Sequence, residues 1–274
     1  MESRSTRDPS EYNVRAIERA IDILECFDDE HPTRGVSEVA EAVGLHKATA
    51  HRIMTTLANR GFLERLHDGQ EYRLGLHLVT LGFQIVRGLE LPREALPYLR
   101  QVAEEYDETV DLSVYDGHEI LVVQIVRSRR VLSLATTVGM RFPPHATATG
   151  KVVMAYLPET EREVVLAGPL ARYTAMTVTS PEILRAQIAA VREHGYGYDD
   201  EEFQPGVRAL AVPVLNRSDE LMAVISMPGP VFRLDEALFP EIAHKLQEAA
   251  HGIAVAMGWQ PPDRGFTQAP NNGR

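Results

Sequence analysis

Cysteine, tryptophan and long apolar runs are what this sequence has least of. Cys26 is the single cysteine among 274 residues, and there is one tryptophan. A single cysteine excludes an intrachain disulfide and any cysteine-rich zinc site, which agrees with a reducing compartment. Its neighbours Ile23, Leu24 and Phe27 favour a packed small hydrophobe over a reactive thiol. No run of about eighteen apolar residues occurs and the N-terminus is charged, so we expect a cytoplasmic protein without a membrane span.

Positive charge is also scarce. The sequence has 28 Lys and Arg residues and 39 Asp and Glu residues, which gives a net charge of −11 at pH 7. This balance opposes phosphate binding by the chain as a whole. Between residues 46 and 73, however, the basic residues outnumber the acidic Glu64, Asp68 and Glu71; they are Lys47, Arg52, Arg60, Arg65 and Arg73. We therefore expect one local basic surface, with a modest and salt-sensitive affinity for DNA.

The most informative segment runs from residue 37 to residue 61. Ser37 is expected to cap a short helix, and Gly44 supplies a sharp turn after it. On the next helix the apolar residues fall on one side, namely Ala50, Ile53 and Leu57. The other side then faces outward and carries Lys47, Ala48, His51, Arg52 and Thr55. This layout is that of a helix-turn-helix whose second helix enters the DNA major groove, which predicts a DNA-binding regulator.

The flanking segments complete a small N-terminal domain. A first helix is predicted from one apolar face made by Ile17, Ala20, Ile21, Leu24 and Phe27. Residues 62–66 and 71–74 alternate and are joined by the turn 67–70, which predicts a hairpin wing whose Arg73 reaches phosphates or a minor groove. A following helix up to residue 89 is apolar over a broad surface, which predicts burial against a second protomer.

The chain from Pro92 onward predicts a mixed α and β domain. Helices are expected over 92–107, 158–166, 181–193 and 240–257, with another beginning near 146–149. Strands are expected over 110–115, 120–127, 131–138, 210–215 and 221–227. A sheet flanked by helices on this scale forms a pocket domain rather than a second DNA reader.

Five separated motifs carry a family resemblance. They are Gly44-Leu-His-Lys-Ala-Thr-Ala-His-Arg, Tyr72-Arg-Leu-Gly, Pro144-His-Ala-Thr-Ala-Thr-Gly-Lys, Gly195-Tyr-Gly-Tyr-Asp-Asp-Glu-Glu and Gly206-Val-Arg-Ala-Leu-Ala-Val-Pro-Val. In this order, between about residues 14 and 259, they resemble the IclR family of bacterial transcription regulators. The resemblance implies an α+β fold with a winged helix-turn-helix domain at 12–76, a connecting and dimerisation helix at 77–91, and a GAF-like effector-binding domain at 92–259. Residues 1–11 and 260–274 are expected to be flexible termini.

The resemblance also implies operator binding by dimers that often pair into tetramers. It places DNA contacts on the outward helix face, and with the wing and the cap the predicted DNA-binding set is Ser37, Lys47, Ala48, His51, Arg52, Thr55 and Arg73. Arg52 is suited to fork onto a guanine edge, and His51 to bond a base or a phosphate. The alternative is a solvated helix face with nothing bound.

For the C-terminal domain the resemblance implies a small effector, commonly a carboxylate, bound where the helix after the Pro144 motif begins. Backbone N–H groups at Ala148 and Thr149 suit an anion there. The walls are expected from Val131, Leu134, Phe142, Val207 and Ala209, and polar partners from Asp199, Ser226 and Thr149. Pro228 stands where family members more often have serine, which removes a hydrogen-bond donor. The apolar walls favour an effector larger or more hydrophobic than glyoxylate, such as an aromatic acid.

Several of these residues have a second interpretation. The apolar ones suit the core equally well, and Asp199 lies in an acidic run of a kind that is usually solvated. His145 suits a helix cap or a pairing with Asp199 better than metal ligation, and we predict no metal site and no cofactor. Arg141 and Arg208 suit either a carboxylate fork or surface ion pairs.

Two other functional classes compete with an effector-controlled regulator. A hydrolase would use Ser226, His145 and Asp199, but Ser226 lies within a predicted strand and no Gly-x-Ser-x-Gly elbow occurs. A DNA-binding protein without effector control would have no use for a separate mixed domain of this size. We therefore predict a DNA-binding regulator that is not an enzyme and is controlled by a small carboxylate.

Overall fold

The structure is a computed structural model, which describes residues 14–28, 30–66, 71–88, 90–131 and 134–258. The chain divides into two compact units, Met1–Gly88 and Leu89–Arg274. The predicted wing turn at 67–70, the expected flexible ends 1–11 and 260–274, and Leu89 of the predicted connecting helix lie outside the described residues. Within those residues, no helix has both the length and the apolar character needed to cross a membrane.

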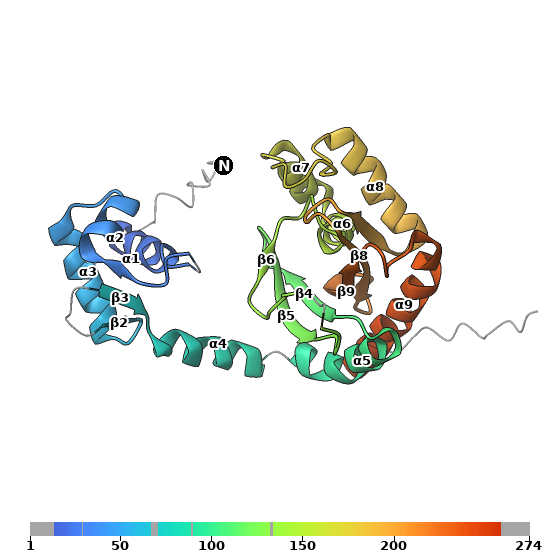
Figure 1. Cartoon of the computed structure of the whole chain (residues 1–274), viewed down its shortest axis with the longest axis horizontal. Helices are drawn as coiled ribbons and strands as arrows, with labels where there is room; N and C mark the ends of the chain where they lie inside the picture. The colour runs from blue at the N-terminus through green and yellow to red at the C-terminus, as the bar shows by residue number, and fades with distance from the viewer. Residues whose placement is uncertain (1–13, 29, 67–70, 89, 132–133, 259–274) are drawn as a thin grey trace, which may run out of the picture. The chain divides into compact units, whose positions relative to one another are not determined.

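In its described residues the N-terminal unit contains three helices and a small sheet, followed by a fourth helix (Figure 1). Its elements are α1 (Arg15–Glu25), β1 (Arg34–Gly35), α2 (Val36–Ala42), α3 (Lys47–Asn59), β2 (Leu63–Arg65), β3 (Glu71–Leu74) and α4 (Leu76–Gly88). The strands are antiparallel in the order β1-β3-β2, with Glu64 opposite Arg73. The predicted helix-turn-helix and wing strands are present, and Gly44 adopts the left-handed conformation expected of its turn, with φ +62°.

The core of this unit is formed by Ile23, Phe27, Val39, Met54, Leu63 and Tyr72. The predicted inner face of α1 was partly wrong, because Ile17 and Ile21 are 59% and 47% exposed while Ile23 is fully buried. Cys26 packs against this core as predicted, and its Sγ donates to the carbonyl of Ile23 at 3.1 Å. Burial raises the pKa of the Cys26 thiol, which disfavours the reactive thiolate.

The predicted cap at Ser37 was also wrong. The helix α2 begins two residues earlier than predicted, at Val36 with Gly35 as its N-cap, and Ser37 lies exposed in its first turn. The carboxylate of Glu38 accepts a hydrogen bond from the Gly35 N–H at 2.7 Å, which is the returning half of a capping box. Pairing of β1 with β3 sets this start, because Gly35 is held opposite Glu71 in the sheet.

The C-terminal unit is built on a six-stranded antiparallel sheet in the order β6-β5-β4-β9-β8-β7. The strands are β4 (Val110–Tyr115), β5 (Ile120–Val126), β6 (Arg141–Phe142), β7 (Gly197–Asp200), β8 (Val207–Leu215) and β9 (Leu221–Pro230). The helical elements are α5 (Glu90–Tyr106), α6 (Ala148–Tyr156), α7 (Glu159–Ala167), α8 (Pro181–His194), the short 3-10 turn η2 (Glu236–Leu238) and α9 (Phe239–Ala256).

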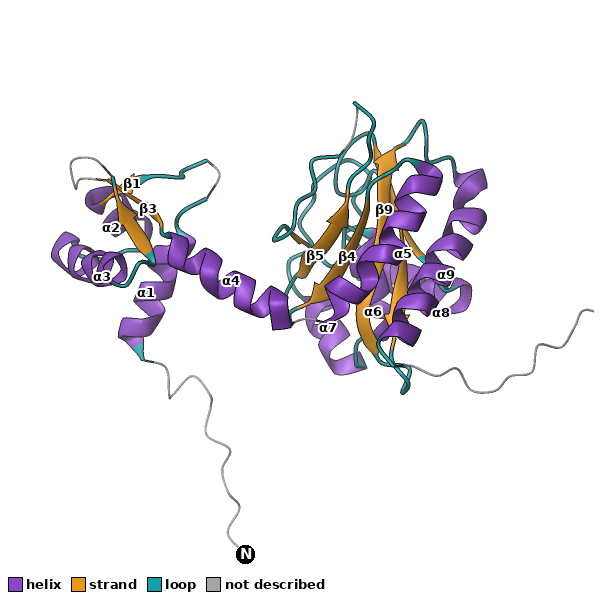
Figure 2. Ribbon diagram, turned by 90° about the horizontal axis from the view of Figure 1, so that it is seen from below, coloured by secondary structure: helices purple, strands orange, loops and turns teal. Residues whose placement is uncertain are grey.

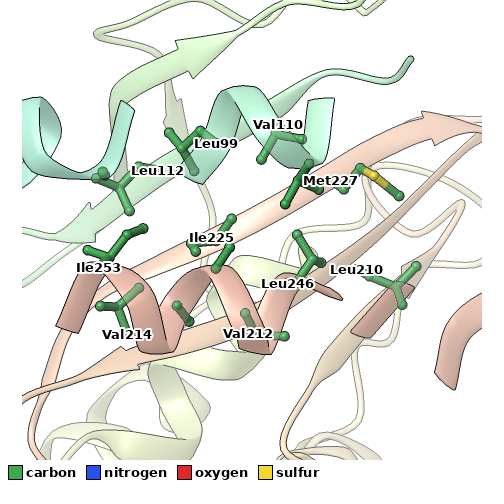
Figure 3. Packing of buried hydrophobic residues seen from close by; sticks show 14 of the residues in the cluster. Leu99, Val110, Leu112, Leu210, Val212, Val214, Ile225, Met227, Leu246 and Ile253 are labelled. Carbon is green, nitrogen blue, oxygen red and sulfur yellow. The ribbon is translucent and has the colours of Figure 1, made fainter. Parts of the chain in front are cut away.

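The two faces of this sheet bury different clusters, because side chains alternate along each strand. One face packs against α5 and α9 through residues such as Leu112, Val212 and Ile225 (Figures 2 and 3). The opposite face packs against α6, α7 and α8 through Ile120, Ala211 and Val224. The second face also carries polar residues at alternate positions, including Asp111, Ser113 and Ser226, and this is the face that bears a cavity.

The predicted strand over 131–138 was wrong. Its described residues form no strand, and Val131 is fully exposed. The backbone of Val122 on β5 is bonded instead to Gly139 and Met140, where Gly139 has φ +93° and turns the chain. Residues 134–136 consequently leave the sheet edge and line the cavity.

Candidate functional site

The outward face of α3 is the first candidate site. Lys47, Ala48, His51 and Arg52 are exposed, whereas Ala50 and Met54 on the same helix are fully buried. Within the described residues, neither Lys47 nor Arg52 takes part in an ion pair, so both cations are available to an external anion. Arg19 of α1 lines the same surface hollow as His51 and Arg52; it was not predicted because it lies outside the helix-turn-helix motif.

The wing residues near this face are already engaged. Arg65 donates from Nη2 to Thr55 Oγ1 at 2.9 Å, which ties β2 to α3 and leaves Thr55 half-buried. Arg73 donates from Nε to Glu64 Oε2 at 2.9 Å across the hairpin, and both side chains are about half exposed. The charge of Arg73 is therefore balanced locally, unlike the charges of Lys47 and Arg52.

The second candidate site is a cavity of about 180 Å³ between the sheet and the start of α6. All of the predicted wall and polar residues line it except Val131, which is solvent exposed for the reason given above. They are Leu134, Phe142, Ala148, Thr149, Asp199, Val207, Ala209 and Ser226. Residues not predicted for the walls also line it, and these are Asp111, Ala135, Thr136, Met140, Thr147, Phe203, Gln204 and Pro228.

The start of α6 is capped by Thr147 and not by His145. Thr147 Oγ1 accepts from the Gly150 N–H at 3.1 Å and donates to the carbonyl of Pro143, also at 3.1 Å. The preceding N–H groups, on Ala148 and Thr149, take part in no hydrogen bond with the described part of the chain. These two donors lie at the positive end of the helix dipole, on residues that line the cavity.

His145 neither caps a helix nor pairs with Asp199, the two roles predicted for it. Its side chain is buried, and Nε2 lies 2.8 Å from the carbonyl oxygen of Ala171, while its ring stacks near Tyr173. Tyr173 in turn contacts Phe203, one of the cavity walls. His145 thus anchors the segment that backs the cavity. Among the described residues no group of His, Cys, Asp and Glu is placed to hold a metal ion.

The segment after β7 is held over the cavity by threonines. Thr177 Oγ1 donates to the carbonyl of Glu202 at 2.6 Å, and Thr174 Oγ1 to that of Glu201 at 2.7 Å. These bonds fix the loop that presents Phe203 and Gln204 to the cavity. The aromatic pair Phe142–Phe203, with centroids 5.4 Å apart, closes one wall.

Asp199 is buried, contrary to what its acidic run indicated. Its side chain is 4% exposed, and Oδ1 accepts from the Glu202 N–H at 2.7 Å. Burial raises the pKa of Asp199 to about 7, against the lowering effect of the Glu202 amide and of Lys151. The run escapes solvation because β7 pairs Asp199 with Ala209 in the sheet.

Asp111 is the charged residue among the cavity-lining residues that the sequence did not predict. It lies on β4 opposite Ser226 of β9, and the hydroxyls of Ser226 and Ser113 donate to its two oxygens at 2.7 and 3.0 Å. Burial raises the pKa of Asp111 to about 6, and the two serine hydrogen bonds offset only part of that effect. A detectable signal was present, because Asp111, Ser113 and Ser226 are polar residues inside otherwise apolar strands.

Of the two roles considered for Arg141 and Arg208, binding a ligand carboxylate or forming surface ion pairs, the structure shows the ion pairs. Arg141 is bonded to Asp116 and lies 3.6 Å from Glu119, while Arg208 donates to Asp200 at 2.5 Å and to Glu236 at 3.1 Å. Neither lines the cavity. The hydrolase constellation is not assembled either, since Ser226 is bonded to Asp111 and His145 to Ala171, and among the described residues neither is bonded to Asp199.

Comparison with known proteins agrees with this organisation. Residues 16–67 match the IclR helix-turn-helix domain, and residues 83–255 match the bacterial transcriptional regulator IclR C-terminal domain. The HTH-type transcriptional regulator XynR of Escherichia coli is 31% identical over 247 residues, covering 90% of this chain and 98% of that protein. The transcriptional repressor IclR of the same organism is 29% identical over 253 residues, covering 91% and 92%.

A solved structure is similar over the same extent. An IclR homologue from Microbacterium hydrocarbonoxydans, complexed with 4-hydroxybenzoate, has a TM-score of 0.77 and 29% identity, covering 89% of this chain and 99% of that one. Both halves of the chain therefore match in the expected order, helix-turn-helix first and mixed α/β domain second. The chain belongs to the IclR family of bacterial transcriptional regulators.

Proposed function

We propose that this protein binds operator DNA as a dimer through α3 and that a small carboxylic acid in the C-terminal cavity controls this binding. The observation that carries the proposal is the cavity itself, with free helix N–H donors at one end and apolar walls beside them. Such a site suits a ligand with one anionic group and one apolar body. No catalytic step is part of this proposal.

The size and lining of the cavity favour an aromatic acid. Its volume of about 180 Å³ is comparable to the ~150 Å³ of an apolar cavity that accepts benzene. Leu134, Phe142 and Val207 offer an apolar surface for a ring, while the N–H groups of Ala148 and Thr149, at the start of α6, suit a carboxylate. The 4-hydroxybenzoate bound by the Microbacterium homologue supports the same ligand class.

For DNA, the unpaired cations Lys47 and Arg52 are the proposed principal contacts. Arg52 would read a guanine edge and Lys47 a phosphate, with Ala48, His51 and Thr55 beside them on the same face. Ser37 and Arg73 are secondary candidates at the edges of this surface. Because operator DNA is the partner, we place the protein's action in the bacterial cytoplasm.

Dimer formation is supported by exposed apolar side chains in the N-terminal unit. Ile17 and Ile21 on α1 and Leu76 and Val79 on α4 are between 47% and 78% exposed. Large apolar side chains exposed on a helix are often covered by a partner. We propose a second copy of this chain as that partner, which would place two recognition helices on two half-sites; pairing of dimers into a tetramer would follow on longer operators.

The test of this function is an operator-binding titration. An operator is first selected from random-sequence duplex DNA with the full chain, and its binding is then followed by fluorescence anisotropy at fixed salt. Arg52→Ala should weaken binding by roughly 1 to 3 kcal/mol. Arg185→Ala is the matched control, because Arg185 is an exposed arginine of the C-terminal unit paired with Glu163. Equal affinity of the wild type and the Arg52 variant would contradict the assignment.

Control by the cavity is tested in the same assay with added aromatic acids. An acid that binds should change operator affinity, and coupling free energies of about 1 to 3 kcal/mol are usual. The variant Ala209→Phe, which fills the cavity from β8, should keep DNA binding and lose the response. A response that persists in this variant would exclude the cavity as the effector site, and the absence of any response would favour DNA binding without effector control.

A further inference from the structure

The floor of the cavity is made by two residues on neighbouring strands. Asp111 on β4 and Ser226 on β9 are register partners, both are 4% exposed, and both line the cavity. They lie on the sheet, whereas the free N–H donors of Ala148 and Thr149 lie on the helix that covers it. The cavity therefore has two chemically different polar surfaces.

The floor of the cavity has hydrogen-bond acceptors available to a ligand but no available donors. A serine hydroxyl has one proton, and that of Ser226 is given to Asp111 Oδ2 at 2.7 Å. Ser113 gives its proton to the other carboxylate oxygen, Oδ1, at 3.0 Å. What remains on Asp111 and Ser226 are lone pairs, so the floor can accept hydrogen bonds from a ligand and has none to donate.

The charges around the cavity also favour a ligand that donates a hydrogen bond to the floor. Among the described residues that line the cavity there is no Lys, Arg or His, so no cation in this lining balances Asp111. A ligand group that only accepts hydrogen bonds, such as a second carboxylate or an ether oxygen, would face lone pairs at the floor. A buried acceptor without a donor is costly, and a site built this way discriminates strongly against ligands that cannot donate.

We propose that Asp111 and Ser226 bind a hydroxyl or amino group of the effector, so that the effector is an acid that carries a hydrogen-bond donor away from its carboxylate. This inference rests on the proposed function, because it assumes that an acid occupies the cavity. It adds a specificity-determining pair, Asp111 with Ser226, and the chemical class of the ligand, a hydroxy- or amino-substituted acid.

The probes are benzoate, its three hydroxy isomers and 4-methoxybenzoate, in which the donor is replaced by an acceptor of similar position. Dissociation constants are measured by isothermal titration calorimetry on the full chain at a pH of about 8, above the pKa values of about 6 and about 7 of Asp111 and Asp199. At least one hydroxybenzoate should bind about tenfold or more tightly than both benzoate and the methoxy ether.

Two variants separate recognition from a structural role. Asp111→Asn replaces one acceptor by a donor at constant shape, and should reduce the preference for the hydroxy acid to about threefold or less. Ser226→Ala removes one of the two acceptors and leaves the Asp111 carboxylate, so the preference should fall to a value between those of the wild type and Asp111→Asn. Asp219→Asn is the matched control, since Asp219 is exposed and at φ +57°, a conformation that asparagine tolerates.

The outcomes are distinct. Benzoate binding as tightly as every hydroxybenzoate would overturn the inference and leave the proposed function intact. An unchanged hydroxy preference in Asp111→Asn would also overturn it. If Asp111 were protonated and donated to the ligand, 4-methoxybenzoate would match or exceed the hydroxy acids, which again contradicts the proposal. Failure of every acid to bind the wild type would reject both the inference and the effector part of the proposed function.

Discussion

Lys151 of α6 and Glu202 after β7 form an ion pair that is almost closed to water, with 2% and 5% of their side chains exposed. The ammonium of Lys151 also donates to the carbonyl of Tyr198 at 3.2 Å, and the backbone N–H of Glu202 donates to Asp199. The pair therefore joins the helix that supplies the cavity's N–H donors to the loop that supplies Phe203 and Gln204. This buried ion pair connects two walls of the cavity, in addition to the threonine hydrogen bonds that hold the loop.

Removal of one member of this pair should be far more harmful than removal of both. Lys151→Met leaves the Glu202 carboxylate buried without its cation, which costs about 3 to 5 kcal/mol, whereas the added change Glu202→Gln should recover a large part. Urea unfolding of the C-terminal unit measures both. Arg185→Met in the exposed pair with Glu163 is the control and should cost about 1 kcal/mol or less. A Lys151 variant as stable as this control would show that the buried pair is not needed.

The buried carboxyl of Asp111 should make stability depend on pH. Its pKa of about 6 lies above the ordinary 3.8, so the folded chain holds this proton more tightly than the unfolded chain. The stability that it contributes is fully present below about pH 4 and is lost as the pH rises through about 6. Asp199 acts in the same direction, with its loss extending through about pH 7.

Asp111→Asn removes the Asp111 share of this dependence. The variant should gain stability relative to the wild type between about pH 4 and pH 7, by at most roughly 3 kcal/mol at the upper end, since one pKa unit corresponds to ~1.4 kcal/mol. Urea midpoints at several pH values, with Asp219→Asn as the control, measure the difference. Parallel stability profiles of the variant and the wild type would show that Asp111 does not titrate in this range.

Gly150 in the first turn of α6 should not tolerate a side chain. A Cβ there would lie 2.0 Å from the carbonyl oxygen of Pro144, which is backbone and cannot rotate away. Alanine is favoured over glycine in a helix by about 1 kcal/mol, so propensity alone predicts that Gly150→Ala stabilises the unit. We expect the opposite sign, a loss of about 1 to 3 kcal/mol from overpacking, together with weaker acid binding.

The control for this change is Gly168→Ala. A Cβ at Gly168 would meet its nearest neighbour, the carbonyl oxygen of Val165, at 3.4 Å, an ordinary contact. Thermal melting of the two variants beside the wild type gives the comparison. Gly150→Ala melting at or above the wild-type temperature would contradict the close approach of α6 to Pro144.

The sequence predicted well those elements in which a regular pattern of apolar residues runs through the whole segment. Residues 110–115 and 240–257 were expected as a strand and a helix, and β4 and α9 occupy nearly the same bounds. Short elements set by pairing were missed. The strand β1 has two residues, and β7 is the polar stretch Gly197–Asp200, which becomes a strand only because β8 lies beside it.

The cavity-lining residues that lie in or near the family motifs were mostly predicted. Those that are brought to the cavity only by tertiary contacts were missed. Asp111 and Ser226 are 115 positions apart, and nothing local to either residue shows that they meet. Val131 was expected in the wall from its position relative to the family motifs, but it is fully exposed and the chain turns at Gly139. The partners of Arg73 and Arg65 were likewise hidden, since the hairpin register places Glu64 opposite Arg73, and packing of the hairpin against α3 brings Arg65 to the Thr55 hydroxyl.

The wing arginine should contribute less to DNA affinity than its charge indicates. Because Arg73 is bonded to Glu64 at 2.9 Å, approach to a phosphate requires breaking that pair or bringing the carboxylate along. Lys47 has no such partner among the described residues. We therefore expect Lys47→Ala to reduce the slope of log affinity against log salt by about 1, and Arg73→Ala to leave it nearly unchanged.

The variant Glu64→Gln tests the same point in reverse. It keeps the shape of the hairpin and frees the Arg73 guanidinium, so operator affinity at low salt should rise and the salt slope should steepen by up to about 1. Anisotropy titrations of the selected operator over a range of salt concentrations give all of these slopes. If Arg73→Ala lowers the slope as much as Lys47→Ala does, and Glu64→Gln leaves it unchanged, then Arg73 leaves Glu64 for a phosphate in the complex and the local charge balance has no influence on binding.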